Sequence, residues 1–349
     1  MDVLMKPLFS SIAALPFLAL GVTAEADPFR AVALTGSEAL ITHALSMPGL
    51  PGEAREERER FEAMRGYRVI PGVAPMTDFR IRPVLSFDPN VNGGVPNGSI
   101  EIAGFTFNID PDLVGQSDIL IGLEASGTLR RNIAEGVALD VRARGSFARA
   151  PRVQVNRARM DVDACLRKQV NPSRYMHGCS GIGYTSTRMG EQVVLHGAIG
   201  GTQAFTAGSA LHAVTLEAGV RNVRPGSGQN FTQGFLRGST ASALNNGTAI
   251  MSSLELGSAV ERTQVTRLRA SLSVAREIHG RPTSIGVQYN QSSGGMFLGE
   301  FRKDHTLGLS VTRQFTDQIT LGANLTQTRS NAQLFNTGPS LGFTMQVNF

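Results

Sequence analysis

The chain has 349 residues, a formal net charge of +5, 39 glycines and no tryptophan, and its mean hydropathy is −0.05. Beyond the N-terminal segment no stretch reaches the ~18 consecutive apolar residues of a membrane-spanning helix, which excludes a helical membrane protein. The abundance of Gly, Ser, Thr, Asn and Val is typical of a soluble all-β protein or a transmembrane β-barrel. The positive charge alone does not identify a partner.

Residues 1–24 have the layout of a secretory signal peptide. Lys6 precedes the apolar run "PLFSSIAALPFLALGV", and small residues follow in "VTAEA", which predicts cleavage after Ala24 or Ala26. An N-terminal membrane anchor is the alternative, but the run is short for a membrane span. No cysteine follows the run, which argues against a lipid-modified N-terminus. We therefore expect an exported protein, for which nucleic acid is a poor candidate partner.

Residues 25–77 are expected to form a short periplasmic helical lead-in. Apolar residues recur at helical spacing over residues 31–45. A charged stretch over residues 53–64 carries Glu and Arg three and four positions apart, which favours an exposed helix. The sequence therefore predicts two helices here, with no catalytic role.

Residues 78–349 form segments of about ten residues that alternate in polarity and are separated by turn residues. In "SDILIGLEASGTL", for example, Ile119, Ile121 and Leu123 share one face. We distinguish about fourteen or fifteen such segments, including "SIEIAGFTF" at 99–107. Because single-chain bacterial barrels have an even number of strands, the prediction is an all-β fold: a transmembrane antiparallel β-barrel of about fourteen strands.

The polar face of these segments favours a membrane barrel over a soluble sandwich. Charged residues there alternate with Gly, Ser and Thr opposite modest apolar residues, which suits a polar lumen inside an exterior that faces hydrocarbon. The lack of Trp and the small number of Tyr argue the other way, because barrels usually carry aromatic girdles. The candidate lumen-lining residues are Glu124, Asp140, Arg142, Arg144, Glu217, Glu255, Arg267 and Arg269.

The chain ends on a strand pattern with no polar tail. A barrel in lipid cannot leave an unpaired edge, so its last strand must pair with its first. The alternating apolar residues are similar to the C-terminal signal that the barrel-assembly machinery is thought to read. They predict a bacterial outer-membrane location, with outer-membrane lipid and lipopolysaccharide as surroundings. These residues are Leu341, Phe343, Met345, Val347 and Phe349.

Two cysteines, Cys165 and Cys179, are predicted to form a disulfide across one loop, between strands near 152–165 and 180–189. A metal site with His177 is the alternative. The six histidines are scattered over different segments, and no common catalytic or phosphate-binding motif is present. We therefore expect no enzyme, no metal and no cofactor.

Two stretches carry a family resemblance. "FRIRPVLSFDPNVNGG" resembles the first barrel strand of the surface lipoprotein assembly modifier family, and "HTLGLSVTRQFTDQITLGANLTQTRSNAQLF…GPSLGFTMQVNF" resembles its final hairpins. The resemblance implies a barrel of about fourteen strands that helps to deliver proteins to the cell surface. Family members carry a helical-repeat domain before the barrel, but about fifty residues are too few for a stack of ~34-residue repeats.

Three functions follow from this reading. The first is passage of an exported client protein across the outer membrane, as the resemblance implies. The second is a passive porin-like channel for small solutes, which Arg142 and Arg144 would bias toward anions unless Asp140 or Glu124 neutralises them. The third is a structural or adhesive barrel that presents the loop between Cys165 and Cys179.

Overall fold

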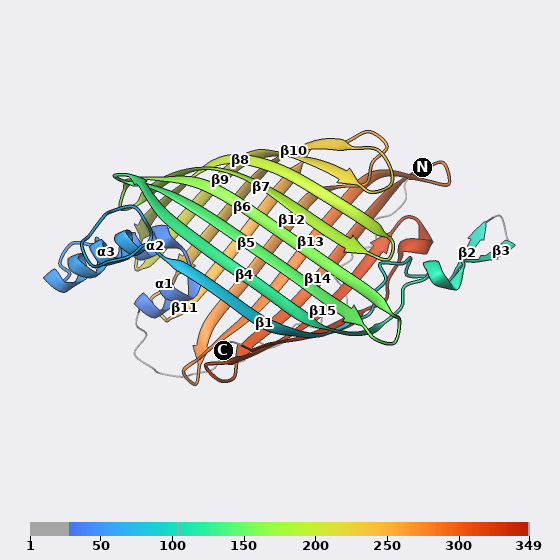
Figure 1. Ribbon diagram of the computed structural model, residues 1–349, viewed down its shortest axis with the longest axis horizontal. Coiled ribbons are helices and arrows are strands. Elements are labelled where there is room, and N and C mark those ends of the chain that lie inside the picture. The colour runs from blue at the N-terminus through green and yellow to red at the C-terminus, as the bar shows by residue number, and fades with distance from the viewer. Residues whose placement is uncertain (1–27, 103–104, 348–349) are drawn as a thin grey trace.

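The computed structural model describes residues 28–102 and 105–347. The predicted signal peptide and Phe349 lie outside these residues. Within the described part of the chain, fourteen antiparallel strands close into one barrel (Figure 1). The barrel strands are β1 (Thr77–Asp88), β4 (Asp118–Ala134), β5 (Val137–Ala150), β6 (Val155–Asn171), β7 (Arg174–Thr187), β8 (Gly190–Ala207), β9 (Ala210–Pro225), β10 (Phe231–Ala243), β11 (Thr248–Gly257), β12 (Val265–Ile278), β13 (Arg281–Phe297), β14 (Glu300–Gln314), β15 (Ile319–Ser330) and β16 (Ser340–Val347).

Closure joins the two ends of the barrel sequence. Strand β1 pairs with β4 over twelve residues on one side and with β16 on the other, where Leu85 lies opposite Met345 and Phe87 opposite Phe343. The predicted fourteen-strand barrel is therefore confirmed. The last strand is needed because it satisfies the backbone groups of β1 that would otherwise form an open edge.

The segment "SIEIAGFTF" is not a barrel strand, contrary to the prediction. It forms a separate two-stranded hairpin, β2 (Ser99–Ile102) and β3 (Phe105–Asn108), that projects beyond one end of the barrel (Figure 1). Each arm has four residues, whereas β1 has twelve and β4 seventeen. At ~3.3 Å per residue, such an arm is too short to cross the barrel wall.

The two faces of the barrel wall differ as the alternation predicts. The outer face exposes large apolar side chains, with Phe79 68%, Ile121 54% and Leu216 63% exposed. The opposite face holds the charged residues, and it is the inner one because Arg130 of β4 and Gln169 of β6 bond to the N-terminal helices inside the ring. We call this inner face the lumen face.

Three helices rather than two precede the barrel: α1 (Pro28–Thr35), α2 (Glu38–Ala44) and α3 (Gly52–Met64). The predicted helix over 31–45 breaks at Gly36, which adopts a φ of 63° that glycine accommodates without strain. Ser37 then caps α2, because its hydroxyl accepts a hydrogen bond from the Leu40 amide. None of the helices in the described residues is long and apolar enough to cross a membrane.

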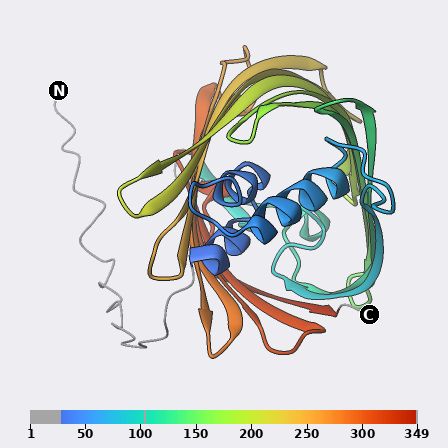
Figure 2. The same ribbon diagram turned by 90° about the vertical axis from the view of Figure 1, so that its left-hand side faces the viewer.

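The helices occupy one mouth of the barrel. Viewed from that end, α1 and α2 lie within the ring of strands and α3 crosses the opening (Figure 2). Val32 of α1 and Leu40 of α2 are buried in one cluster with lumen-face alanines. A fully buried leucine contributes roughly 1.5–3 kcal/mol, so this cluster is a substantial part of the helix–barrel attachment. The alanines are Ala138, Ala204, Ala213 and Ala243.

The other mouth is narrowed by the segment between β1 and β4, residues 89–117, which we call the β1–β4 loop. Val91 is fully buried against the lumen-face residues Leu120, Ala148 and Val155. Further along, Asp112 pairs with Arg188 in the β7–β8 turn at 3.2 Å. Elsewhere in the loop, the Asn97 amide donates to three carbonyls of the β15–β16 loop at 2.8–3.2 Å. The β1–β4 loop therefore enters the lumen and is fixed to two distant points of the rim.

Candidate functional site: a charged lumen closed by helices

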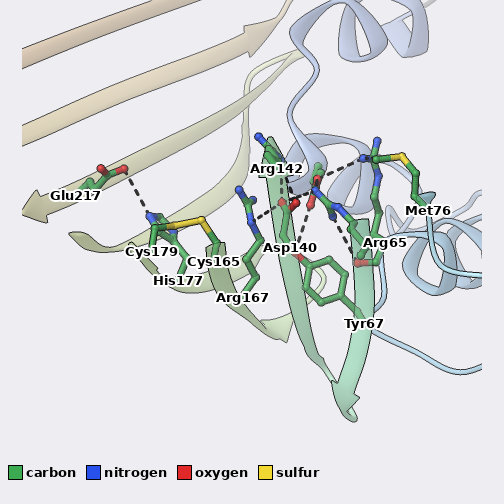
Figure 3. Close-up of polar contacts among 12 residues, drawn as sticks. Arg65, Tyr67, Met76, Asp140, Arg142, Cys165, Arg167, His177, Cys179 and Glu217 are labelled. Atoms are coloured by element: carbon green, nitrogen blue, oxygen red, sulfur yellow. Dashed lines mark hydrogen bonds and ion pairs between the residues drawn. A yellow bond between two sulfur atoms is a disulfide. The ribbon is translucent and has the colours of Figure 1, made fainter. Parts of the chain in front are cut away.

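The helices are anchored to the wall by a buried ion-pair cluster. Arg130 of β4 is fully buried, and its Nη2 donates to Glu38 Oε1 on α2 and, at 3.0 Å, to Asp140 Oδ2 on β5. Asp140 also accepts from Arg142 at 2.8 Å and lies 3.3 Å from Arg167 Nε (Figure 3). One buried cation therefore links helix α2 to two strands of the wall.

Glu38 has further partners on the segment that follows the helices. Arg65 Nη1 lies 3.5 Å from Glu38 Oε1, and the Tyr67 hydroxyl donates to Oε2 at 3.2 Å. Burial would raise the pKa of Glu38, but the hydrogen bond and charge of Arg130, with the charges of Arg167 and Arg65, outweigh it and lower that pKa. The pKa of Tyr67 is raised, mainly by burial and then by Glu38, so its hydroxyl stays neutral. Glu38 is therefore a carboxylate at neutral pH.

Further along the lumen, other carboxylates are each shared between arginines. Glu124 accepts from Arg82 Nε at 2.7 Å and from Arg144. Glu255 accepts from Arg237 Nε at 3.0 Å and from Arg221. Together with the three arginines around Asp140, these clusters contain seven guanidinium groups. Arg130 also pairs with Glu38 and Arg237 contacts Glu217, so the seven guanidinium groups share five carboxylates.

The exposure of these ion pairs is unequal. The side chain of Arg142 is 50% exposed while that of Asp140 is 1% exposed, and Arg144 is 57% exposed beside Glu124 at 9%. Arg237 repeats the pattern, at 40% beside Glu255 at 4%. In these three pairs the carboxylate is buried in the wall and the arginine is partly exposed to the lumen. The pattern is not general, because Arg130 is fully buried and Asp163 is 40% exposed.

The strand register places seven of the eight predicted lumen-lining residues on the lumen face, whereas Arg267 lies at a β-bulge of β12. Glu217 contacts His177 Nε2 and Arg237 Nη1, both at 3.6 Å. Arg267 donates from Nε to the Gly257 carbonyl at 2.9 Å. Arg269 is exposed opposite Glu255 in the register of β11 and β12, so it is not part of the buried clusters.

Five arginines of the clusters were not among the predicted residues: Arg82, Arg130, Arg167, Arg221 and Arg237. Arg82, Arg221 and Arg237 lie in predicted strands at alternate positions that face the lumen, so the alternation of polarity could have identified them. Arg167 lies just beyond the strand predicted near 152–165. Arg130 lies in "RRNIAEG", which reads as a turn, whereas β4 continues to Ala134 and places Arg130 opposite Asp140. The turn signal of Glu135 and Gly136 therefore hid the residue that joins the helices to the wall.

Large lumen-face side chains lie flat on glycines of the neighbouring strand. A Cβ added at Gly219 would come within 2.5 Å of the Phe235 ring, and one at Gly200 within 2.7 Å of His177 Nε2. Each glycine is the direct cross-strand partner of the side chain that covers it. The missing Cβ lets these rings lie along the wall, which leaves the bore open.

The far side of the lumen has a different chemistry. On β13, β15, β16 and the part of β14 beyond Asp304, the described lumen-face residues are mostly glycine, serine, threonine, asparagine and glutamine. Around the closed ring these strands lie across from β5–β10, which carry most of the ion pairs. We call the two sides the neutral wall and the charged wall. The neutral-wall residues exposed to the lumen are Gln288, Ser310, Thr312, Asn324 and Thr344.

Cys165 and Cys179 form a disulfide, but not across a surface loop. They are directly paired residues of β6 and β7, on the lumen face of the charged wall. The chain between them is a hairpin whose turn, residues 172–173, lies at the mouth that holds the helices, where Ser173 contacts His43 of α2. The predicted loop and the strand limits around it are therefore wrong, because β6 and β7 continue almost to the turn.

The described residues contain no group of three or more His, Cys, Asp or Glu placed to hold a metal ion. Both cysteines are bonded to each other, and His177 contacts Glu217. His196 pairs with Asp163 at 2.9 Å. These side chains therefore belong to the ion-pair lining of the charged wall.

Comparison with known proteins leaves the family open. No family model and no curated protein matches the chain. Solved structures similar to it include OccAB3 of Acinetobacter baumannii (8% identity, 78% of this chain and 99% of that chain, TM-score 0.39) and OprB of Pseudomonas putida (8%, 78% and 94%, 0.45). A loop-deletion mutant of OmpT, an outer membrane protein of Vibrio cholerae, is also similar (9%, 78% and 99%, 0.43). At TM-scores below 0.5, none of these likenesses decides between functions.

Proposed function

We propose that this protein is an outer-membrane channel for small solutes that prefers anions and is closed at rest by its N-terminal helices. The observation that carries the proposal is the unequal exposure of the lumen ion pairs. In three ion pairs the carboxylate is buried in the wall, and its partner Arg142, Arg144 or Arg237 is partly exposed to the lumen. Rings of exposed cationic side chains favour anions in a pore.

The outer-membrane location rests on the outer face of the barrel. Exposed Phe79, Ile121 and Leu216 belong to an apolar belt that water would disfavour and hydrocarbon would accept. The orientation rests on the loops. Turns at the mouth with the helices have two to four residues, whereas the other mouth carries the 29-residue β1–β4 loop. Since outer-membrane barrels place short turns in the periplasm, the helices close the periplasmic mouth.

Replacing Glu38 with Gln tests the closed resting state. The variant loses the ionic partner of Arg130 and Arg65 on α2, while Asp140 still pairs with Arg130. The loss of about 1–2 kcal/mol of docking free energy gives a roughly 5- to 30-fold rise in the ratio of open to closed channels. Single-channel recording of the refolded full-length protein in a planar bilayer measures this ratio, and the reversal potential in a KCl gradient measures anion preference.

Glu57→Gln is the matched control, because Glu57 lies on the exposed face of α3 in a 3.9 Å pair with Arg60. We expect this variant to behave like the native protein. An equal open fraction in all three proteins would contradict closure by the helices. A cation-selective current would contradict the proposed role of the exposed arginines.

Protein delivery to the cell surface is a second candidate. It is supported by helix α3, which crosses the periplasmic mouth and exposes charged side chains, with Arg55 77% and Arg60 66% exposed, where an exported client would arrive. Under this function the lumen would pass a chain rather than ions. Absence of current in every variant, with release of a client that depends on α3, would favour it over the channel.

A further inference from the structure

We propose that the preferred solutes are small polyhydroxylated molecules with one anionic group, of which sugar acids are the simplest case. This inference rests on the proposed channel and adds a substrate class to it. It comes from the pairing of a charged wall with a neutral wall across one lumen. Each wall recognises a different part of such a solute.

The charged wall provides the anion contact. The charged residues that line a cavity on this wall are Arg142, Arg221 and Arg237 with Asp140, Asp163 and Glu217. Arg142 and Arg237 expose 50% and 40% of their side chains there. A guanidinium group can bind a carboxylate or a phosphate through two parallel hydrogen bonds. An anionic group that moves along the lumen can therefore bind first to one exposed arginine and then to the next.

The neutral wall provides hydroxyl contacts. Gln288 and Asn324 lie over Gly308 and Gly342 of the adjacent strands, so their amides rest along the wall and remain exposed to the lumen. Thr312 of β14 and Thr344 of β16 add hydroxyl groups to the same wall. Amides and hydroxyls both donate and accept, which matches the hydroxyls of a polyol. This described part of the lumen face carries no charged side chains. A second charged wall would hold an anion too tightly.

The two walls together separate solutes by class. An inorganic anion or acetate contacts the charged wall alone, and a neutral sugar gains hydrogen bonds without the ionic contact. A sugar acid that moves along the lumen can contact each wall in turn. Binding strong enough for entry but divided among several weak sites is what permits conduction.

The test measures uptake into proteoliposomes that contain the full-length native protein. Labelled glucuronate, glucose 6-phosphate, acetate and glucose are compared in one preparation, so that the fraction of open channels cancels from each ratio. We expect glucuronate to enter about fivefold faster than acetate and than glucose, which corresponds to about 1 kcal/mol. Faster entry of glucose 6-phosphate than of glucuronate would identify phosphate as the preferred anionic group.

The double variant Gln288→Ala with Asn324→Ala removes the amides of the neutral wall. It is expected to bring the ratio of glucuronate to acetate close to one. Gln327→Ala is the matched control, because Gln327 is an amide on the same strand as Asn324 but on the outer face. It should keep the native ratio.

The outcomes separate the two proposals. If chloride current is anion-selective but glucuronate enters no faster than acetate, the sugar-acid inference is overturned and the channel stands. If the native ratio is high and the double variant retains it, the neutral wall is not the cause and the inference also fails. If no solute enters and no anion current appears in the native protein or in Glu38→Gln, the channel itself is rejected.

Discussion

At the scale of single residues, glycine determines where the lumen stays open. Gly219 is the clearest case, because an added Cβ would lie 2.5 Å from the Gly197 carbonyl oxygen and 2.5 Å from the Phe235 ring. Arg221 and Arg237 stack on that ring, with guanidinium carbons 4.7 and 5.3 Å from its centroid. A glycine in β9 thus positions an aromatic ring and, through it, two arginines of the charged wall.

Gly219→Ala is therefore expected to push Phe235 toward the bore and to displace the two arginines. Overpacking of this kind costs about 1–3 kcal/mol, so thermal unfolding in detergent should occur at a lower temperature. Single-channel conductance should fall as well. Gly145→Ala is the control, because a Cβ there meets only the Arg159 carbonyl oxygen at 3.9 Å. Equal losses in both variants would show that the effect is one of strand glycines in general.

Glu38 gives a pH dependence at the same scale. Its pKa in the folded protein lies below the ordinary value of 4.5, since the contacts with Arg130, Arg167 and Arg65 outweigh burial. A lowered pKa means that its contribution to docking is fully present above about pH 4.5 and is lost as the pH falls through the folded pKa.

We expect the open fraction of the channel to rise on acidification below about pH 4.5. Planar-bilayer recordings at stepwise lower pH measure this rise, and Glu38→Gln should lack it. The titration of His43 on α2 must be distinguished from that of Glu38. Burial lowers the pKa of His43, so its protonation would begin to weaken docking below about pH 6.5. A rise that persists unchanged in Glu38→Gln would assign the effect to another group.

At the scale of elements, the alternation of apolar and polar residues predicted the barrel and which side chains of each strand face the lumen. It could do so because each strand has one face toward the polar lumen and one face toward the outside of the barrel. It did not predict where strands end. "SIEIAGFTF" alternates like a barrel strand but forms the β2–β3 hairpin, and "VNPSRYMHGC" reads as a loop although β6 and β7 extend to residues 171 and 174. Strand limits depend on pairing with neighbours, which local sequence does not contain.

The candidate site, too, could be predicted from the sequence only in part. The charges Glu124, Asp140, Arg142 and Arg144 could be assigned to the lumen from their spacing. Their partners could be assigned only in part, since the pairing of Arg144 with Glu124 depends on the register of β4 against β5. The docking of α2 on Arg130 joins residues 92 positions apart and had no sequence signal.

At the scale of the whole molecule, the lumen is obstructed at both mouths. The helices occupy one mouth, held there by the Arg130 cluster and the buried alanines. The β1–β4 loop enters the other mouth, where Val91 is fully buried and Asn97 and Asp112 tie it to distant parts of the rim. Two obstructions along one path act in series, so the larger resistance limits the current.

This arrangement predicts how variants at the two mouths combine. Val91→Asp places an unpaired charge in an apolar cluster, which costs enough to expel that part of the loop from the lumen. Alone it should change the current little, because the helices remain the larger resistance. Combined with Glu38→Gln, it should raise the conductance of each open channel above that of Glu38→Gln alone.

Leu113→Asp is the matched control for this pair of variants, because Leu113 belongs to the same loop and is 46% exposed, so a charge there meets water. Single-channel recordings of Glu38→Gln, Val91→Asp, the double variant and Leu113→Asp distinguish two quantities. These are the open fraction, which Glu38 governs, and the conductance of the open state, which the loop governs. If Val91→Asp alone opened the channel fully, the helices would not be the main barrier, and closure would belong to the β1–β4 loop.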